Sequence, residues 1–270
     1  MSILHSILTD LADESQQLDG WVEHLDEAQW RLDTPAAGWT IAHQIGHLAW
    51  TDDASLTAID DPEAFGQMMK AAVADPAGFV DAGAEQWATL EPQRLLWRWR
   101  DGRGELADAL ACVPEGQKIS WFGPPMSAAS MATARMMETW THARDIAAAL
   151  QIEPPRDHRA RHIAYLGVRT RDFAYQMRGE DPPANQFRVE LTGPDGEEWS
   201  WGPEDANQRV TGDGYDFALL ATRRLHRDDA EVHANGPDAR YWLGIIQAFA
   251  GPPGNDPPRK SEMPQKNEAQ

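Results

Sequence analysis

Apolar residues recur at the spacing of an α-helix through most of the first 150 positions, and this periodicity limits the possible folds more than any other feature. Proline, glycine and aspartate interrupt the pattern at intervals, as they do between helices. The segments with the helical period lie at about 2–18, 40–59, 61–75, 91–110 and 127–150. Long helices joined by short breaks bury their apolar faces most simply as an antiparallel bundle of about four helices.

The second half of the chain changes from the helical period to two-residue alternation. One more helix is expected over 159–177, and strands are expected where apolar and polar residues then alternate. The expected strands lie at 187–191, 199–201 and 207–211, and two short helices at 215–225 and 238–249. We therefore predict a mainly α protein with two domains.

The domain boundaries follow from the proline-rich breaks. Residues 1–153 are predicted to form a four-helix bundle, residues 154–251 a small α+β domain, and residues 252–270 a disordered tail of mostly polar and proline residues. A length of 270 residues suits two modest cores, because single cores tend to stop growing at about 250–300 residues.

The charge of the chain argues against several classes of partner. Asp and Glu number 43 against 24 Lys and Arg, a formal net charge of -19. A surface this acidic repels phosphate backbones and anionic membranes, so we expect neither nucleic acid nor membrane as a partner. The first residues carry acids where a secretory signal would carry Lys or Arg, and we expect a cytoplasmic protein.

The chain contains a single cysteine, Cys112, which excludes an intrachain disulfide and a thiolate-rich metal cluster. No His or basic residue lies near it in sequence, so we expect it to be buried and inert. Any metal must then be held by His, Asp or Glu side chains.

Two segments place such side chains one helical turn apart. In TIAHQIGHLAW, His43 and His47 are four residues apart, and in METWTHARDIAAAL the same spacing separates Glu138 from His142. Residues with this spacing project from one face of a helix, where an imidazole and a carboxylate can converge on one ion. His47 is the natural third ligand, because the apolar residues flanking it point to the bundle interior. Three ligands would leave a position open for water or substrate.

Simpler interpretations of these residues stay open. Glu–His pairs with this spacing are common on solvated helix surfaces, and a lone histidine on an apolar face is usually a core residue. His43 is either an outer residue of the site or simply exposed. Asp145 either orients a ligating imidazole from outside or pairs with an arginine. The Trp121-Phe122 segment, in a Gly- and Pro-rich break, is either a lid over the bundle or part of its packing.

The stretches GWTIAHQIGHLAW and ETWTHARDIAAAL resemble the metal-binding four-helix domain of the DinB/YfiT superfamily. Within it, the chain is most similar to the mycothiol-dependent maleylpyruvate isomerase group, in an actinobacterial branch without an assigned activity. The resemblance covers about residues 1–150. It implies a divalent metal, usually zinc, held by a histidine of the second helix and an E-x3-H pair of the fourth, which match His47, Glu138 and His142.

The C-terminal segments GYDFALLATRRLHRDD and NGPDARYWLGIIQAFAGPPG resemble the small domain that follows the metal domain in that group. The resemblance implies that an arginine after the helix binds a substrate carboxylate, and Arg224 is the positional match. The family's usual glycine before it is Arg223 here. The alternative is that Arg223, Arg224 and Arg227 balance the neighbouring acidic residues.

The resemblance implies a metal- and thiol-dependent transferase or isomerase. Zn²⁺ would be the metal and mycothiol or another low-molecular-weight thiol the cosubstrate, with a small-molecule electrophile as substrate. A homodimer is a further expectation, since bundles of this kind often pair through helices. The alternative is a non-catalytic protein of the same superfamily that binds a metal or a small ligand.

Overall fold

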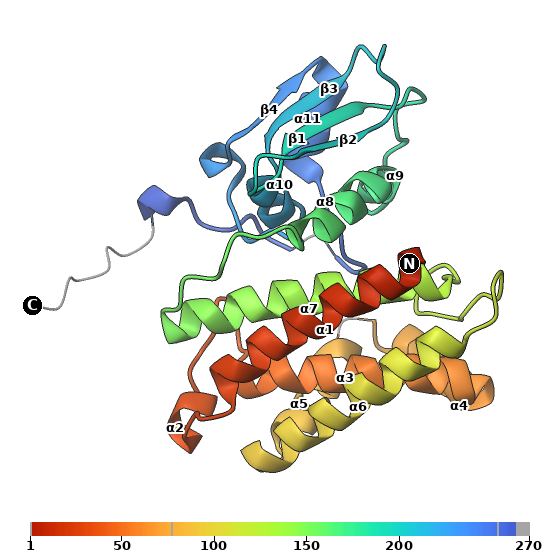
Figure 1. Ribbon diagram of the computed structural model, residues 1–270, viewed down its shortest axis with the longest axis vertical. Coiled ribbons are helices and arrows are strands. Elements are labelled where there is room, and N and C mark those ends of the chain that lie inside the picture. Colours follow the sequence, from red (N-terminus) through yellow and green to blue (C-terminus); the bar gives the residue numbers. More distant parts are fainter. Residues whose placement is uncertain (1, 77, 253, 263–270) are drawn as a thin grey trace, which may run out of the picture. The chain divides into compact units, whose positions relative to one another are not determined.

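The structure is a computed structural model that describes residues 2–76, 78–252 and 254–262. It divides into two compact units, Met1–Pro154 and Pro155–Gln270. The first unit is helical and the second combines helices with a sheet (Figure 1). The mainly α architecture predicted from the sequence, a helical bundle followed by a small α+β unit, is confirmed.

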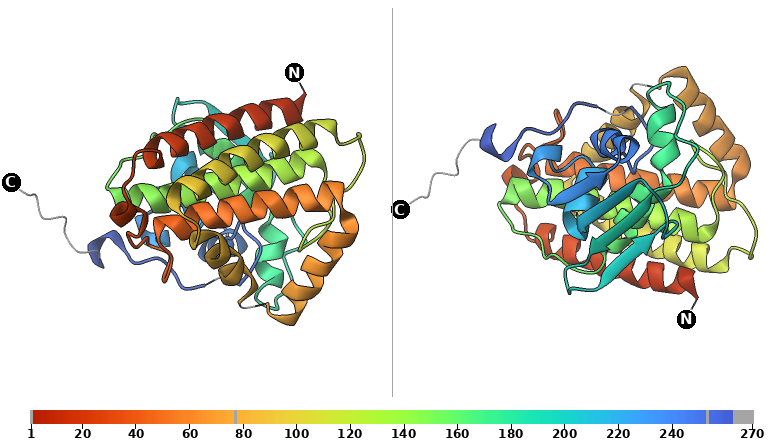
Figure 2. Two further views of the ribbon diagram at one scale, coloured as in Figure 1. Left: turned by 90° about the horizontal axis from the view of Figure 1, so that it is seen from below. Right: turned by 90° about the horizontal axis from the view of Figure 1, so that it is seen from above.

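Four long helices build the first unit: α1 (Ile3–Val22), α3 (Ile41–Asp60), α6 (Pro92–Cys112) and α7 (Ala128–Leu150). They run alongside one another, and α3 contacts both α6 and α7 (Figure 2). Three shorter helices complete the unit: α2 (Glu27–Trp30), α4 (Pro62–Ala74) and α5 (Phe79–Ala88).

The starts of these helices follow local chemistry. Ser127 precedes α7, and its hydroxyl oxygen accepts a hydrogen bond from the backbone N–H of Ser130 at 3.2 Å. Pro62 and Pro92 occupy the first helical positions of α4 and α6, where a missing N–H costs nothing. These are the signals from which the sequence predicts the helices.

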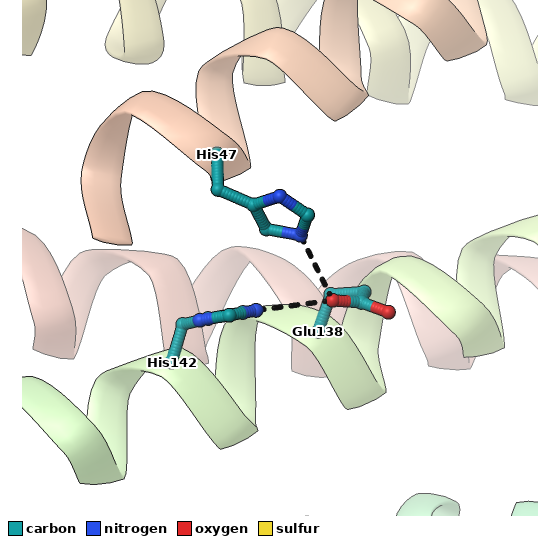
Figure 3. A group of neighbouring side chains, drawn as sticks. All are labelled: His47, Glu138 and His142. Carbon is teal, nitrogen blue, oxygen red and sulfur yellow. Dashed lines mark hydrogen bonds and ion pairs between the residues drawn. The ribbon is translucent and has the colours of Figure 1, made fainter. Parts of the chain in front are cut away.

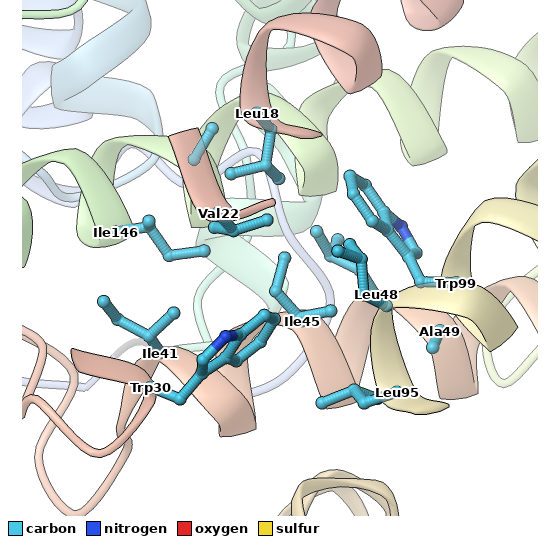
Figure 4. Close-up of a cluster of buried hydrophobic side chains, with 12 residues drawn as sticks. Leu18, Val22, Trp30, Ile41, Ile45, Leu48, Ala49, Leu95, Trp99 and Ile146 are labelled. Carbon is cyan, nitrogen blue, oxygen red and sulfur yellow. The ribbon is translucent and has the colours of Figure 1, made fainter. Parts of the chain in front are cut away.

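One end of the bundle is filled by a cluster of buried apolar side chains (Figure 4). Leu18 and Val22 come from α1, Ile45 from α3, Trp99 from α6 and Ile146 from α7. All five are at most 1% exposed, so the apolar faces of the four long helices meet in one core. Ile45 and its neighbour Leu48 are both buried, and they fix the rotation of α3 on either side of His47.

Ion pairs also cross the bundle interior. The Arg135 guanidinium on α7 donates to Asp52 on α3 at 2.9 Å, and both side chains are buried. Asp19 on α1 accepts from Arg103 on α6 at 2.6 Å. Burial would raise the pKa of Asp19, but Arg100 and Arg103 outweigh it and hold this pKa below its usual value. These pairs tie α1 to α6 and α3 to α7, and loss of one member would leave a charge uncompensated.

The second unit contains a four-stranded sheet in the order β2-β1-β3-β4. Its strands are β1 (Arg188–Thr192), β2 (Glu198–Trp201), β3 (Arg209–Asp213) and β4 (Val232–Asn235). β1 pairs antiparallel with β2 and parallel with β3. The helices of the second unit are α8 (Ala160–Arg169), α9 (Arg171–Gln176), α10 (Gly214–Ala221) and α11 (Pro237–Ile245). Short 3₁₀ turns lie at Arg227–Asp229 and Lys260–Glu262.

Several expectations are corrected. The helix expected over 159–177 is two helices, because the chain turns at Thr170, whose hydroxyl lies 2.7 Å from the carbonyl oxygen of Gln247. The short elements α2 and β4 were not predicted. Cys112 is exposed rather than buried, because it ends α6 beyond the last buried residue of that helix, Leu110.

Two further expectations concern the tail and the membrane. Of the predicted tail 252–270, residues 253 and 263–270 lie outside the described residues, and residues 260–262 form a 3₁₀ turn. Among the described residues, no helix combines the length and apolar character that a bilayer crossing requires.

The helices α3 and α5 approach each other closely at Gly46. A Cβ atom there would lie 2.8 Å from the carbonyl oxygen of Ala84 and 3.1 Å from the backbone nitrogen of Ala88. Backbone atoms cannot rotate away as a side chain can. Gly46 is therefore required for this packing, directly beside His47.

We expect the Gly46→Ala variant to lower the free energy of unfolding by about 1–3 kcal/mol, because α5 must shift to admit the methyl group. Gly66→Ala in α4 is the matched control, since nothing lies within 4 Å of its added Cβ. That control should gain about 0.5–1 kcal/mol from helix propensity. Urea unfolding followed by circular dichroism measures both, and equal effects would contradict the close approach.

Candidate metal centre

The three residues predicted as metal ligands lie together in the helical unit (Figure 3). His47 projects from α3, and Glu138 and His142 project one turn apart from α7. The Oε2 atom of Glu138 lies 3.2 Å from Nε2 of His47 and 3.2 Å from Nε2 of His142. One ligand atom from each residue falls within 4.8 Å of the others. Because α3 lies against α7, residues 91 positions apart in sequence meet here.

A chain of hydrogen bonds determines that Nδ1 of His142 is a donor. The Thr34 hydroxyl donates to the carbonyl oxygen of Trp39 at 2.8 Å, which can only accept. The Thr34 oxygen therefore accepts from the amide nitrogen of Gln44 at 2.7 Å. The amide oxygen of Gln44 then faces Nδ1 of His142, so this ring nitrogen donates. In a neutral imidazole the other nitrogen, Nε2, carries the lone pair and points at Glu138.

The environment of His47 also favours the neutral ring. Burial lowers the pKa of His47 to about 4, although its contact with Glu138 acts in the opposite direction. Burial would raise the pKa of Glu138, but its contacts with His142 and His47 outweigh burial and hold this pKa well below the usual value. At neutral pH Glu138 is therefore a carboxylate anion and His47 an uncharged imidazole.

The Nε2 atom of His142 and the carboxylate oxygen of Glu138 are 3.2 Å apart, and a neutral ring with its proton on Nδ1 has only a lone pair to direct at that oxygen. Such an arrangement is unfavourable unless a cation or an additional proton lies between the two atoms. Two imidazole nitrogens and a carboxylate oxygen are a donor set that suits Zn²⁺. The residues present therefore fit a bound divalent metal.

The separations agree with that donor set. Nitrogen and oxygen ligands at about 2.0–2.2 Å from a tetrahedral zinc lie about 3.3–3.6 Å from each other. The two measured distances of 3.2 Å are close to this range. His47 and His142 are only 7% and 8% exposed, so both rings already lie largely out of water. Nδ1 of His47 is buried without a hydrogen-bond partner among the described residues.

Two indole rings flank the histidines. Trp39 stacks on His142 with ring centroids 5.8 Å apart, and its centroid is 5.2 Å from that of His47. Its indole N–H donates to Asp81 on α5 at 3.0 Å, which holds the ring in place. Trp50 lies 6.0 Å from His47 on the same helix. The cluster therefore has apolar walls next to a carboxylate.

His43 takes a structural part at the start of α3. Its Nδ1 atom accepts from the backbone N–H of Thr40 at 3.2 Å, so Nε2 carries the proton and donates to Glu85 on α5 at 2.6 Å. His43 thus joins the first turn of α3 to α5, one turn away from His47. Asp145 is buried on α7.

Trp121 and Phe122 pack within the helical unit. Trp121 stacks on Phe65 at 5.9 Å, and Phe122 contacts Phe79 at 5.3 Å and Trp50 at 6.3 Å. The loop therefore extends the aromatic wall that begins at Trp50. Movement of this loop as a lid stays a prediction.

Arg224, the predicted carboxylate-binding residue, lies in the C-terminal unit just after α10. Its guanidinium donates to the carbonyl oxygen of Thr222 at 2.7 Å. The preceding Arg223 adopts a left-handed backbone conformation with φ 58°, and it pairs with Asp256 at 2.5 Å. Glycine adopts that conformation most easily, in agreement with the glycine usual at this position in the resembled group. The role of Arg224 stays a prediction.

Sequence reasoning did not single out Gln44 or Trp39 as residues of the site. Gln44 is fully buried and contacts a residue 98 positions away, so no local pattern marks it. The available signal was its place on the same helix as His47, three residues earlier.

The protein is a helical bundle in which two imidazole nitrogens and one carboxylate oxygen meet between helices. Comparison with known proteins identifies its family. The model of the mycothiol maleylpyruvate isomerase N-terminal domain matches residues 11–147, and a shorter model described as wyosine base formation matches residues 183–234. The chain belongs to the mycothiol maleylpyruvate isomerase N-terminal domain family.

Relatives and solved structures also match the chain. Two uncharacterised proteins of Mycobacterium tuberculosis, from strains CDC 1551 / Oshkosh and ATCC 25618 / H37Rv, are each 56% identical over 247 residues, covering 92% of this chain and 96% of theirs. A crystal structure of the mycothiol-dependent maleylpyruvate isomerase matches with a TM-score of 0.54 and 18% identity, over 87% of this chain and 95% of that one. A mutant of the same enzyme matches over the same shares, with 18% identity and a TM-score of 0.55. At this identity the two structures establish the shared fold.

The hydrogen-bond chain predicts a protonated Nδ1 on His142. In ¹⁵N-histidine-labelled protein, we expect a His142 Nδ1–H resonance protected from exchange with water, and we expect Gln44→Leu to lose that protection. Ser55→Ala is the control, because Ser55 is equally buried on α3 and hydrogen-bonds away from the cluster, to Thr51. A protected signal that persists in Gln44→Leu would show that another group holds the ring.

Proposed function

We propose that this protein is a metal- and thiol-dependent transferase or isomerase, with Zn²⁺ held by His47, Glu138 and His142. The single observation that carries the proposal is the convergence of three ligand atoms, one each from His47, Glu138 and His142, which lie within 4.8 Å of one another. Two imidazole nitrogens and a carboxylate oxygen are a donor set that suits Zn²⁺. Three protein ligands also leave the fourth tetrahedral position for a substrate atom, as in catalytic zinc sites.

The chain's own residues prepare this position in three ways. Glu138 contributes the negative charge that draws a cation, and the Nε2 atoms of both imidazoles face its carboxylate. Gln44 holds the His142 ring in one orientation. Trp39 and Trp50 flank the histidines with apolar surface, which reduces the water around the site and strengthens charge interactions there. When bound, a divalent zinc would supply the positive charge that lowers the pKa of a coordinating thiol.

The family supports a thiol as the cosubstrate. The matching domain model and the matching solved structures both carry mycothiol in their descriptions. We therefore propose mycothiol or another low-molecular-weight thiol, together with a small electrophile. The thiolate sulfur would form a C–S bond with an electrophilic carbon of the substrate.

The fate of that bond separates the two activities. In an isomerase the sulfur adds to a conjugated double bond, the remaining single bond rotates, and the thiolate leaves again. In a transferase the C–S bond persists, and either a proton is taken up or a leaving group departs. If the substrate carries a carboxylate, Arg224 is the proposed partner, because a guanidinium donates two parallel hydrogen bonds to that group.

Metal content tests the ligand set directly. We expect untagged protein from zinc-replete cells to contain close to one zinc per chain by elemental mass spectrometry, and we expect His47→Ala and Glu138→Ala to lose it. His43→Ala should keep the metal, because His43 lies on the same helix but outside the cluster. Circular dichroism checks that each variant is folded. Wild-type protein without metal would favour a non-catalytic role.

Thiol chemistry is tested by mass spectrometry of products. We expect thiol adducts or isomerised product when the protein is incubated with mycothiol and a panel of conjugated electrophiles. A zinc chelator and the His142→Ala variant should each abolish the reaction. Zinc-loaded protein that reacts with none of the thiol and electrophile pairs would contradict the thiol mechanism while leaving the metal site intact.

A further inference from the structure

The C-terminal unit contains a cavity of about 300 Å³ at one end of its sheet. The cavity lies where α8 and α9 meet the start of β1 and the end of β2, and all its lining residues belong to this unit. Ligand pockets in proteins measure about 300–1,000 Å³, so this one suits a small molecule.

The walls of the cavity are aromatic for a reason that follows from the strand pairing. Val189 of β1 is in register with Trp201 of β2, and Leu191 with Trp199, so these residues share one face of the sheet. Trp199 is fully buried, whereas Trp201, at the end of β2, is only half-buried. Its indole ring therefore extends the face beyond the packed core and forms a wall of the cavity.

Other rings complete the apolar surface. Tyr165 on α8 faces Trp201 with ring centroids 6.5 Å apart, and 42% of this tyrosine is exposed. Phe187 and Trp242, both buried, line the cavity and contact each other at 5.6 Å. A flat apolar molecule can pack against Trp201 and Tyr165, the two rings that are not fully buried.

Only some of the polar groups that line the cavity have hydrogen-bond partners among the described residues. Arg171 is committed, because it donates to Asp172 at 2.7 Å and to the carbonyl oxygen of Asn185 at 2.7 Å, and it lies over the Phe187 ring. The guanidinium of Arg169, in contrast, has no hydrogen-bond or ion-pair partner among the described residues, and it too lines the cavity.

A second donor is also unused. The indole N–H of Trp242 is buried and has no acceptor within the described part of the chain. Trp242 is 1% exposed and lines the cavity, and buried polar groups of this kind are ordinarily satisfied.

We propose that this cavity binds a small aromatic carboxylate. The ring system of the ligand packs against Trp201 and Tyr165, and its carboxylate accepts hydrogen bonds from Arg169. The charges that line the cavity are Arg169, Arg171 and Asp172, which leave a net positive charge in a protein of net charge -19. An anion is therefore favoured at this place although the protein as a whole repels it.

This cavity is a different site from the metal centre, because all its lining residues lie in the C-terminal unit. Binding of an aromatic carboxylate there does not depend on the proposed thiol reaction. Loss of the proposed zinc would leave the cavity and its binding unchanged.

Titration of the full-length protein with 2-naphthoate, followed by isothermal calorimetry, tests the proposal. We expect saturable binding, with Arg169→Gln weakening it about fivefold, since an exposed charge pair is worth up to about 1 kcal/mol. Arg161→Gln is the matched control, because Arg161 is another exposed arginine of α8 that does not line the cavity. 2-Naphthamide, which has the same ring and no charge, should bind equally to the wild-type protein and to Arg169→Gln.

The ring wall has its own test. We expect Trp201→Ala to weaken naphthoate binding about tenfold and Trp201→Phe to retain most of it, since the phenyl ring keeps part of the contact area. Unchanged affinity in Trp201→Ala, or equal effects of Arg169→Gln and Arg161→Gln, would overturn the proposed site. So would the absence of saturable binding up to about 5 mM, which corresponds to a negligible affinity.

Discussion

The opposition of His142 Nε2 and Glu138 Oε2 across 3.2 Å is the constraint on which the candidate centre depends. Gln44 accepts a hydrogen bond from the other ring nitrogen of His142, Nδ1, and so keeps Nε2 turned toward Glu138. The packing of α3 on α7 keeps these atoms together, and the rings have little room to turn away. A cation at this point would lie among three ligand atoms that fall within 4.8 Å of one another, as the proposed metal site requires.

The residues that orient the His142 ring come from several parts of the helical unit. Thr34 and Trp39 precede α3, Gln44 and His47 belong to it, and His142 lies on α7. Each hydrogen bond in this series has a defined donor, so the orientation of one imidazole depends on a loop hydroxyl two contacts away. The same loop contributes the Trp39 ring that stacks on that imidazole. The orientation of the His142 ring and the ring nitrogen that donates are thus determined together.

The two units carry different kinds of binding chemistry. In the helical unit the functional groups are buried acceptors, which suit a cation. The cavity of the C-terminal unit instead places the guanidinium of Arg169 beside aromatic rings, which suits an anion with a flat body. The family assignment rests on residues 11–147, which contain His47, Glu138 and His142. The second is a property of this chain's own residues.

The sequence by itself determined the helices and the spacing of Glu138 and His142, because periodicity, capping residues and one-turn neighbours depend on positions within about four residues of each other. It also pointed to His47 through the apolar residues that flank it and through a family resemblance. Tertiary structure alone decided that Gln44 meets His142, that Thr170 splits a helix and that Cys112 is exposed. These outcomes depend on contacts between segments up to 98 residues apart, and packing of the whole core, rather than any local pattern, selects such contacts.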